Sequence, residues 1–354
     1  MATLILEDGT RFEGTLFGSR QSVTGETIFT TGMCGYQETM TDPAYSGQIV
    51  CMTYPLIGNV GINDLDFESG SVKPAGVIVS ELCDLPSNWQ MKKTLDEFFC
   101  EQNVTGMYGV DTRALTRHLR SKGAMRGRIV DGDADEADLS AVKAFEKHDH
   151  VFEAACKEAY AIEGKGDLHI AVLDLGMKKS LTKWIEKSCA KVSVYPAASS
   201  AEEILASGCD GVLVSAGPGN PEDYPQIVNT VKVLMEEKPV MGVGLGHLMM
   251  ALASGAKTEK MLYGHHGSNQ PVKDLERGTC AVTGQAIGYA VSGSLPEGVT
   301  VSHINWNDKT VEGLRYEGKN AFSVAFVPAG LGGPFDTTYL FDAYIQMVRE
   351  NRAK

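Results

Sequence analysis

The stretch GVLVSAGPGNP, at residues 211–221, joins an apolar strand to a glycine-rich turn and the start of a helix. Other apolar runs flank it and are predicted to be strands: HIAVLDLG (169–176), VSVY (192–195) and PVMGV (239–243). The segments between these runs are predicted to be helices, at 178–189, 200–207 and 221–236. This alternation predicts an α/β fold with a mostly parallel sheet and helices on both faces. Ligands of such sheets bind beyond the carboxyl ends of the strands.

Local signals predict where two of the later helices begin. Asn220 is placed to cap the helix at 221–236, with Pro221 at its first position. Asp336 is placed to cap the last helix. That helix is expected to turn five side chains toward a core: Leu340, Phe341, Tyr344, Ile345 and Val348.

The first part of the chain has a different, mixed pattern. Short apolar runs around Asp8-Gly9 predict a hairpin, and 76–83 (GVIVSELC) predicts a buried strand. Thr94 and Glu97 form a capping-box pattern ahead of a helix. A further helix is predicted from Asp111 to Gly123, and it carries four cations that form either a solvated face or an interface with an acidic partner: Arg113, Arg117, Arg120 and Lys122.

These patterns predict two domains. Residues 1–150 are expected to form an N-terminal mixed α/β domain, and 168–354 the α/β domain with the mostly parallel sheet. Between them, 151–167 is acidic, rich in alanine and weakly patterned, so we expect a linker there. A chain of 354 residues is long enough for two hydrophobic cores.

Composition limits the classes of partner. The formal net charge of −13 argues against nucleic acid or an anionic membrane as the main partner. The N-terminal MATLILEDGT lacks the basic and apolar regions of a signal peptide. The eight cysteines are scattered, without zinc-ligand spacing, so we expect reduced thiols, a cytoplasmic location and no metal site.

The turn at 242–246 (GVGLG) is the most informative motif. A strand followed by G-x-x-x-G and a helix has the layout of a nucleophile elbow, whose central residue carries the reactive side chain. Here the central residue is Gly244, which has no side chain. A dinucleotide-binding turn is the rival interpretation, but its third glycine would fall at His247 and not at Gly246.

Longer strings carry a resemblance along nearly the whole chain, apart from a shortened linker near 150–168. They are LEDGTRFEG, TGMCGYQETMTDPAYSGQIV, TYPLIGNVGIN, DTRALTRHLRSKGA, LVSAGPGNP, GLGHLMMALASGAKTEKM, YGHHGSNQPVKD and GPFDTTYLFDAYI. In these strings the chain resembles the small, glutaminase subunit of carbamoyl-phosphate synthetase. The resemblance implies an N-terminal small-subunit domain followed by a class I glutamine amidotransferase domain. In that family an elbow cysteine attacks glutamine with the help of a histidine and a glutamate. The ammonia passes to the large subunit, which makes carbamoyl phosphate from bicarbonate and ATP.

The chain differs from the family at the positions of the catalytic and substrate-contacting residues. The family's elbow reads G-x-C-L-G-H-Q, which places Gly244 at the nucleophile and Leu248 at the glutamine. The family's F-x-G-H-P-E segment places Val327 at the base and Ala329 at the orienting acid. The family's Q-N-H-G-F segment places Ala286 at a substrate-contacting asparagine. An acyl-enzyme route needs a nucleophile beside a base, so we predict no useful glutamine hydrolysis.

Part of the family's glutamine pocket is retained. By resemblance, Ser46 would help to bind substrate, and Gly217 and Leu245 would supply backbone N–H groups to the oxyanion. The remaining matches are Gly219, in the same turn as Gly217, and the wall residues Gly288 and Tyr289. The turns require glycine for their own geometry, so the retained glycines are explained either by folding or by residual glutamine binding.

Three functions follow as expectations. The first is a small subunit of carbamoyl-phosphate synthetase that has lost glutaminase activity and serves assembly or regulation of an ammonia-using complex, for arginine or pyrimidine synthesis. The second is an active glutaminase with a relocated nucleophile, for which His303 is a candidate base. The third is a binding or regulatory protein detached from the synthetase. In the first, the large subunit is the partner, ATP and Mg²⁺ belong to that subunit, and the small molecules are glutamine or ammonia. We do not expect His265-His266 to bind a metal ion, because the sequence places no third ligand beside this pair.

Overall fold

The computed structural model describes residues 1–146, 149–187, 189–328 and 333–353, and its contacts divide the chain into two compact units. Unit 1 comprises Met1–His148 and Leu262–Gly267, and unit 2 comprises Asp149–Met261 and Ser268–Lys354. Sequence patterns did not assign Leu262–Gly267 to the first unit. Its place there depends on tertiary contacts, such as the Tyr263 ring 5.6 Å from that of Phe29.

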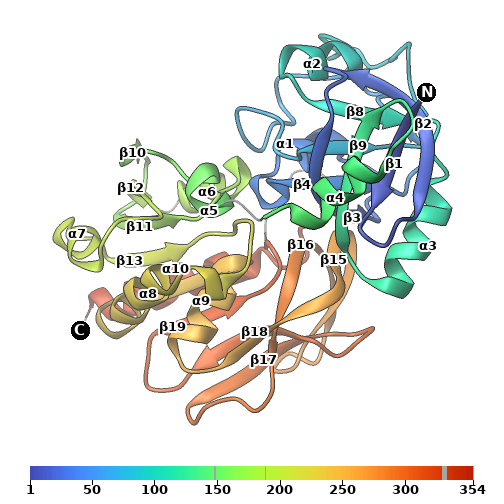
Figure 1. The fold of residues 1–354 in the computed structure, drawn as a ribbon. Coiled ribbons are helices and arrows are strands. Elements are labelled where there is room, and N and C mark those ends of the chain that lie inside the picture. Colours follow the sequence, from blue (N-terminus) through green and yellow to red (C-terminus); the bar gives the residue numbers. More distant parts are fainter. Residues whose placement is uncertain (147–148, 188, 329–332, 354) are drawn as a thin grey trace. The chain divides into compact units, whose positions relative to one another are not determined.

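Unit 1 is built on a closed barrel, which leaves no unpaired sheet edge. In spatial order the barrel strands are β1 (Ala2–Leu6), β2 (Arg11–Gly18), β8 (Thr105–Tyr108), β6 (Gly76–Ile78), β4 (Gln48–Met52), β3 (Val23–Thr30) and β9 (Met125–Asp131). All of these except β6 are labelled in Figure 1. Alternate strand residues such as Leu4, Ile49 and Ile129 fill its interior. A separate small pair joins β5 (Leu56–Ile57) to β7 (Glu81–Leu82).

The local predictions for unit 1 are mostly confirmed. β1 and β2 form the expected antiparallel hairpin, with Gly9 at φ +87° in the turn. Thr94 and Glu97 form the capping box of α2 (Leu95–Glu101). The single strand predicted at 76–83 is wrong, because the chain leaves β6 after Ile78 and forms the separate strand β7. Unit 1 also contains α1 (Tyr36–Thr41), η1 (Pro43–Tyr45) and α4 (Glu136–Ala144).

Helix α3 (Thr112–Lys122) begins and ends as predicted. The Asp111 side chain accepts a hydrogen bond from the Ala114 N–H, and Gly123 ends the helix at φ +103°. Its apolar face, with Leu115 and Leu119 fully buried, packs in the barrel core.

Residues 151–167, expected to form a linker, contain regular structure that belongs to unit 2. α5 (His150–Ala154) covers its start, and β10 (Tyr160–Glu163) pairs antiparallel with β12 (Cys189–Pro196). Side chains in β10 are largely exposed, as expected of an edge strand. That exposure explains why the segment lacks a strong hydrophobic pattern.

The sheet of unit 2 has ten strands in the described part of the chain. In spatial order they are β10, β12, β11 (Leu168–Asp174), β13 (Gly211–Val214), β14 (Val240–Val243), β19 (Ala321–Val324), β18 (Val311–Tyr316), β16 (Cys280–Ser292), β15 (Lys257–Asp274) and β17 (Val299–Asn305). Only β12, β11, β13, β14 and β19 pair in parallel. The expected mostly parallel sheet is therefore correct for these five strands and wrong for the rest, because β15 to β18 are joined by direct returns and not by helical crossovers.

Helices cover both faces of the parallel strands. One core contains residues of α7 (Ala201–Ala206), α8 (Pro225–Glu237) and α9 (Leu245–Ala253). The other contains residues of α6 (Lys179–Ile185) and α10 (Tyr339–Arg352). β11 shows the division, since Ala171 and Leu173 face the first core while Ile170 and Val172 face the second. No helix among the described residues is long and apolar enough to cross a membrane.

Three predicted helix boundaries are wrong. The helix expected at 221–236 is split, with Asn220 capping the short η2 (Pro221–Asp223) and α8 starting at Pro225. Pro225 lacks an N–H and would clash with the preceding turn of a continuous helix, but it suits a first helical position. α6 ends at Ile185, well before 189, and Asp336 does not cap α10, since its carboxylate accepts from the Val282 N–H at 3.3 Å. The predicted core stripe of α10 is confirmed as buried.

Candidate functional site

The predicted elbow is present at the carboxyl end of β14. Gly244 lies between β14 and α9 with φ +57° and ψ −116°, a conformation that residues with side chains rarely adopt. Its N–H donates to the Val324 carbonyl at 2.9 Å, and the Gly246 N–H donates to the Ser215 carbonyl at 3.1 Å. The backbone of a nucleophile elbow is therefore built, and its ends are tied to both neighbouring strands.

Packing requires glycine at Gly246 more strictly than at Gly244. A Cβ atom on Gly246 would lie 2.2 Å from the Val214 carbonyl oxygen, which is backbone and cannot move aside. A Cβ atom on Gly244 would lie 3.0 Å from the Ala216 Cβ and 3.9 Å from the Ala325 oxygen. A small side chain at Gly244 therefore has room after a slight shift of its neighbour, and its cost lies mainly in the positive φ. Gly244 itself has only a hydrogen atom in that space.

The next parallel strand, β19, presents hydrocarbon where the resemblance expects a base. Val327 follows this strand, half buried, and packs against the core that contains Phe326. Its N–H donates to the Gly284 carbonyl at 3.2 Å, so its backbone is also tied to the sheet. The isopropyl group can neither accept nor donate a proton. Ala329, the expected position of the orienting acid, lies outside the described residues.

The turn after β13 has its glycines for packing reasons. A Cβ atom on Gly217 would lie 2.0 Å from the Leu175 carbonyl oxygen, and Gly219 has φ +93°. The hydroxyl of Ser215 accepts from the Leu175 N–H at 2.9 Å and donates to the Ala216 carbonyl at 2.8 Å. The turn is thus held by close backbone packing and by the Ser215 hydroxyl.

The positions in unit 2 that are expected to recognise substrate either carry apolar side chains packed in the core or have open space beside them. Leu245 and Leu248 are both buried in the core of α9, so the side chain at the family's glutamine position takes part in packing. On β16, Ala286 presents a half-buried methyl group, and a Cβ atom on Gly288 would meet nothing within 4 Å. Tyr289, partly buried, packs against the same core as α9.

Ser46 belongs to unit 1, while the other expected pocket residues that the structure describes belong to unit 2. Its N–H donates to the Pro43 carbonyl at 3.0 Å and closes η1.

His247, on the elbow helix, is fully buried and bonded at one nitrogen. Its Nδ1 lies 2.8 Å from the Ser323 hydroxyl, which in turn lies 3.0 Å from the Tyr316 hydroxyl. Its Nε2 has no hydrogen-bond partner among the described residues. Burial, followed by the positive charge of His303 when protonated, lowers the pKa of His247 to about 3, so the ring is neutral at physiological pH.

Sequence patterns missed the partners of His303. Its Nε2 lies 3.6 Å from an Asp274 carboxylate oxygen and 3.4 Å from the Tyr339 hydroxyl, and its Nδ1 lies 2.9 Å from the Ser302 hydroxyl. Burial holds the pKa of His303 below its ordinary value, although Asp274 opposes that shift. The cross-strand register that pairs Asp274 with His303 could not be inferred from local periodicity.

This arrangement leaves His303 poorly suited to act as a base. Both ring nitrogens face protein groups, and the Tyr339 hydroxyl donates to Asp274 at 2.7 Å. The ring also packs edge-on against Phe326, with centroids 5.6 Å apart. A thiol or a water molecule would have to displace one of these contacts to reach the imidazole.

Three of the eight cysteines are poorly suited to act as a relocated nucleophile. Burial raises the pKa of Cys51, Cys156 and Cys189 to about 12, and these thiols therefore stay protonated. No group of three potential metal-binding His, Cys, Asp or Glu side chains occurs within the described ranges. His266, in the expected histidine pair, is buried against the Tyr45 ring at 5.8 Å between centroids.

Comparisons with known proteins agree with this architecture. The carbamoyl-phosphate synthase small chain, CPSase domain, family matches residues 4–129, and the glutamine amidotransferase class-I family matches residues 171–347. The carbamoyl phosphate synthase pyrimidine-specific small chain of Bacillus subtilis is 45% identical over 98% of this chain and 95% of its own length. The small chain of Bacillus caldolyticus is 45% identical over 99% of this chain and 97% of its own length.

A more distant relative shows the same coverage. The carbamoyl phosphate synthase small chain of Clostridium perfringens is 43% identical over 98% of this chain and 99% of its own length. Identity of this degree across both units, together with the two family matches, shows that this chain belongs to the carbamoyl-phosphate synthase small-chain family, with a class I glutamine amidotransferase domain.

Proposed function

We propose that this chain is a carbamoyl-phosphate synthase small chain that has lost glutamine hydrolysis and serves as an assembly or regulatory subunit of an ammonia-using complex. One observation carries the proposal. A complete elbow backbone holds a hydrogen atom at Gly244, and the adjacent strand end holds an isopropyl group at Val327. The resemblance places the third catalytic position at Ala329, whose methyl group also lacks a reactive atom.

The chemistry explains why these substitutions matter. Glutamine hydrolysis through an acyl-enzyme needs a nucleophile to attack the carboxamide carbon and a base to take up the proton from that nucleophile. The same base then donates a proton to the departing ammonia and activates the water that releases glutamate. With neither group present, only backbone donors and substrate binding remain. Removing a complete triad costs on the order of 10⁶ in kcat in a well-studied hydrolase.

Residual glutamine binding is weakly supported by the pocket positions. Gly217 and Gly246 are required by close backbone packing, so their retention needs no substrate to explain it. Leu248 and Ala286 offer no polar group to a carboxamide. Each buried polar group of the substrate left without a partner would cost about 1–3 kcal/mol. Within unit 2, the wall residues Gly288 and Tyr289 are the positions at which any remaining contact would be made.

Family membership supplies the partner. A small chain implies a large chain of the same synthase, and we place ATP and Mg²⁺ on that large chain. Ammonia would enter the complex directly. One relative carries the description pyrimidine-specific, so we propose pyrimidine synthesis and make arginine synthesis the alternative.

The test combines assembly with nitrogen-donor specificity. The chain would be mixed with the large chain of carbamoyl-phosphate synthase from the same organism, and the complex isolated by size exclusion. We expect carbamoyl phosphate to form with ammonia and not with glutamine. A small chain that carries cysteine at the elbow is the positive control for glutamine use.

Two results would overturn the proposal in different ways. Glutamate release from glutamine at ordinary enzyme rates would show a relocated nucleophile, and a cysteine-directed glutamine analogue would then identify it. Failure of the two chains to co-elute would instead favour a protein detached from the synthase.

A further inference from the structure

Helix α3 in unit 1 has two chemically opposite faces. One face is buried in the barrel core through Leu115 and Leu119. The other carries Arg113, Arg117 and Arg120, all exposed, at positions i, i+4 and i+7. At 1.5 Å per residue these three arginines span roughly 10 Å along one side of the helix. We call these three residues the α3 basic face.

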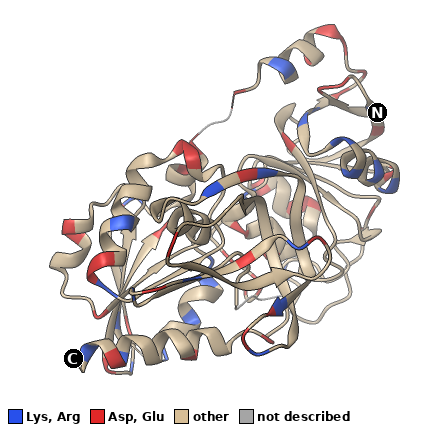
Figure 2. Cartoon of the chain, turned by 90° about the horizontal axis from the view of Figure 1, so that it is seen from below, with Lys and Arg blue, Asp and Glu red and all other residues tan. Residues whose placement is uncertain are grey.

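The guanidinium groups of the α3 basic face have no carboxylate partner among the described residues. No salt bridge within 4.0 Å is recorded for them, although the chain has 45 acidic residues and a net charge of −13. The nearby Asp8 is paired with His118 at 2.7 Å, and Asp111 caps the helix. In Figure 2 several blue bands gather on α3, on the same side of the view as the N label. Basic charge is thus concentrated and uncompensated on an otherwise acidic chain.

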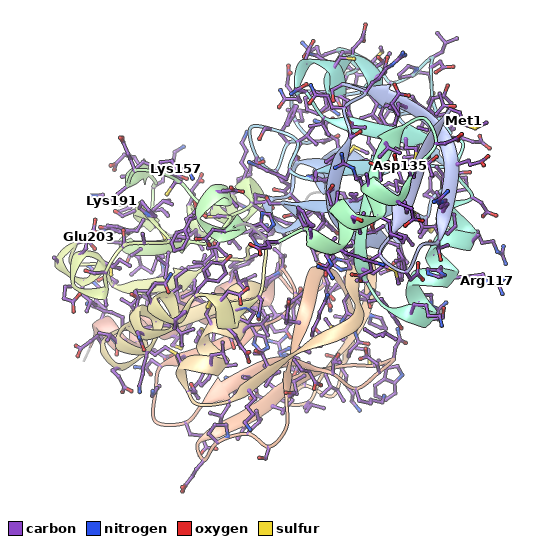
Figure 3. The ribbon with its side chains drawn as sticks, in the orientation of Figure 1. Met1, Arg117, Asp135, Lys157, Lys191 and Glu203 are labelled. Carbon is purple, nitrogen blue, oxygen red and sulfur yellow. The ribbon has the colours of Figure 1, made fainter. Side chains whose placement is uncertain are left out.

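The surface beside these arginines is concave. A hollow of about 650 Å³ is lined by the α3 basic face together with Thr53, Ser80 and the helix-capping Asp111. Arg117 extends outward from α3 in Figure 3 and also lines a second hollow, with His118 and Ser121. Guanidinium forks suit carboxylate side chains that project from another surface, whereas the Thr53 hydroxyl already donates to the Thr30 carbonyl at 2.9 Å.

We propose that the α3 basic face is the docking surface for an acidic patch on the carbamoyl-phosphate synthase large chain. This inference rests on the proposed function, because it takes the large chain as the partner. Two observations select the occupant. Uncompensated arginines require an acidic surface, and membership of the small-chain family supplies the large chain as the partner that brings it. Two copies that met through the same face would instead place their arginines against each other.

The experiment compares two charge-reversed variants of the full chain. The test variant is Arg113→Glu, Arg117→Glu and Arg120→Glu. The matched control reverses three exposed lysines of unit 2, Lys191, Lys232 and Lys257, and so changes the net charge equally. The dissociation constant for the large chain would be measured by calorimetry at two salt concentrations. Sedimentation of each small chain alone would report self-association.

We expect the test variant to bind the large chain roughly 10- to 100-fold more weakly, with a smaller loss of affinity on adding salt than the wild type shows. The control should change affinity by less than about threefold. Equal weakening in both variants, or in neither, would overturn the inference. Loss of self-association without loss of large-chain binding would overturn it too.

Two further measurements keep the outcomes distinct. If wild type does not bind the large chain at all, the proposed function fails and this docking surface fails with it; if wild type binds and the test variant binds equally, only the docking surface fails. Thermal unfolding would check that the variants fold. Should the triple variant unfold, Arg117→Glu alone still reports the effect, because the side chain of Arg117 is exposed and its loss leaves the buried face of α3 intact.

Discussion

Two neighbouring regions of unit 2, the elbow after β14 and the strand end after β19, lack a reactive side chain in different ways. At the elbow the chain turns at Gly244, which has positive φ and no side chain, and the Gly246 N–H donates to the Ser215 carbonyl. At the strand end the Val327 N–H donates to the Gly284 carbonyl, and the Val327 side chain is hydrocarbon. The comparison teaches that hydrogen bonds and close packing fix the path of the backbone in both regions without a reactive side chain. Retained glycines are therefore evidence of fold and not of activity.

The largest expected effect is a gain of glutamine hydrolysis when reactive side chains are introduced at the elbow and at the strand end. Gly244→Cys alone should leave glutamate release from glutamine unchanged, since no base is supplied. Gly244→Cys with Val327→His and Ala329→Glu should raise it by on the order of 10², the low end of general-base effects. The readout is glutamate formed per enzyme. Val327→His with Ala329→Glu but without the cysteine is the control. Glutamate release by Gly244→Cys alone that exceeds the wild type and equals the triple variant would mean that another residue already serves as the base.

A second, smaller effect concerns how strictly packing holds the elbow. Gly246→Ala should lower the free energy of unfolding by about 3 kcal/mol, because its Cβ would overlap the Val214 carbonyl, 2.2 Å away. Gly284→Ala, on β16, is the matched control, since its Cβ would meet nothing within 4 Å. Urea unfolding of both variants measures the difference. Similar stability for the two would show that the elbow can shift and that the backbone is not held by packing.

A pH experiment examines the contact that joins the two regions, His247 on the elbow helix with Ser323 on β19. Burial lowers the pKa of His247 to about 3, while in the unfolded chain the pKa has the ordinary histidine value of 6.5. Below pH 6.5 the unfolded state therefore binds a proton that the folded state does not. The contribution of the neutral His247 ring to the stability of the folded state is therefore complete above pH 6.5 and is lost as the pH falls toward 3. This one group should contribute about 1 kcal/mol of lost stability per pH unit in that range.

The measurement is the urea midpoint between pH 7 and pH 5, in wild type and in His247→Gln. The variant should lose less stability over this range than wild type. His266, with a pKa lowered to about 4 by burial, shifts in the same direction in both proteins and so cancels in the comparison. Parallel pH curves for the two proteins would mean that His247 titrates normally in the folded state.

The smallest effect is expected at Gly244 itself. Gly244→Ala should destabilise by roughly 1–2 kcal/mol, mainly from the positive φ of +57°, since Ala216 is close at 3.0 Å but able to yield. The loss should be smaller than that of Gly246→Ala in the same urea assay. A larger loss would indicate that this turn has repacked around glycine and could no longer accept a nucleophile.

Sequence patterns predicted the parts of this site that depend on neighbours in the chain. The apolar strand, glycine turn and helix around Gly244 appear within a few residues, and the same short strings show the absence of reactive groups at Gly244 and Val327. Helix ends were less well predicted where two signals competed. Pro221 and Pro225 both suit a first helical position, and only the second begins α8.

By itself the sequence determined the alternation of strands and helices in unit 2, the elbow, the basic side of α3 and the chemical character of each reactive position. These follow from residue identity and from contacts over one or two turns of chain. Only the tertiary structure decided that unit 1 closes into a barrel, that Leu262–Gly267 belongs with it, and that Asp274 lies opposite His303. The physical reason is that strand order and register are set by pairing and packing between distant segments, whose local patterns are compatible with several registers.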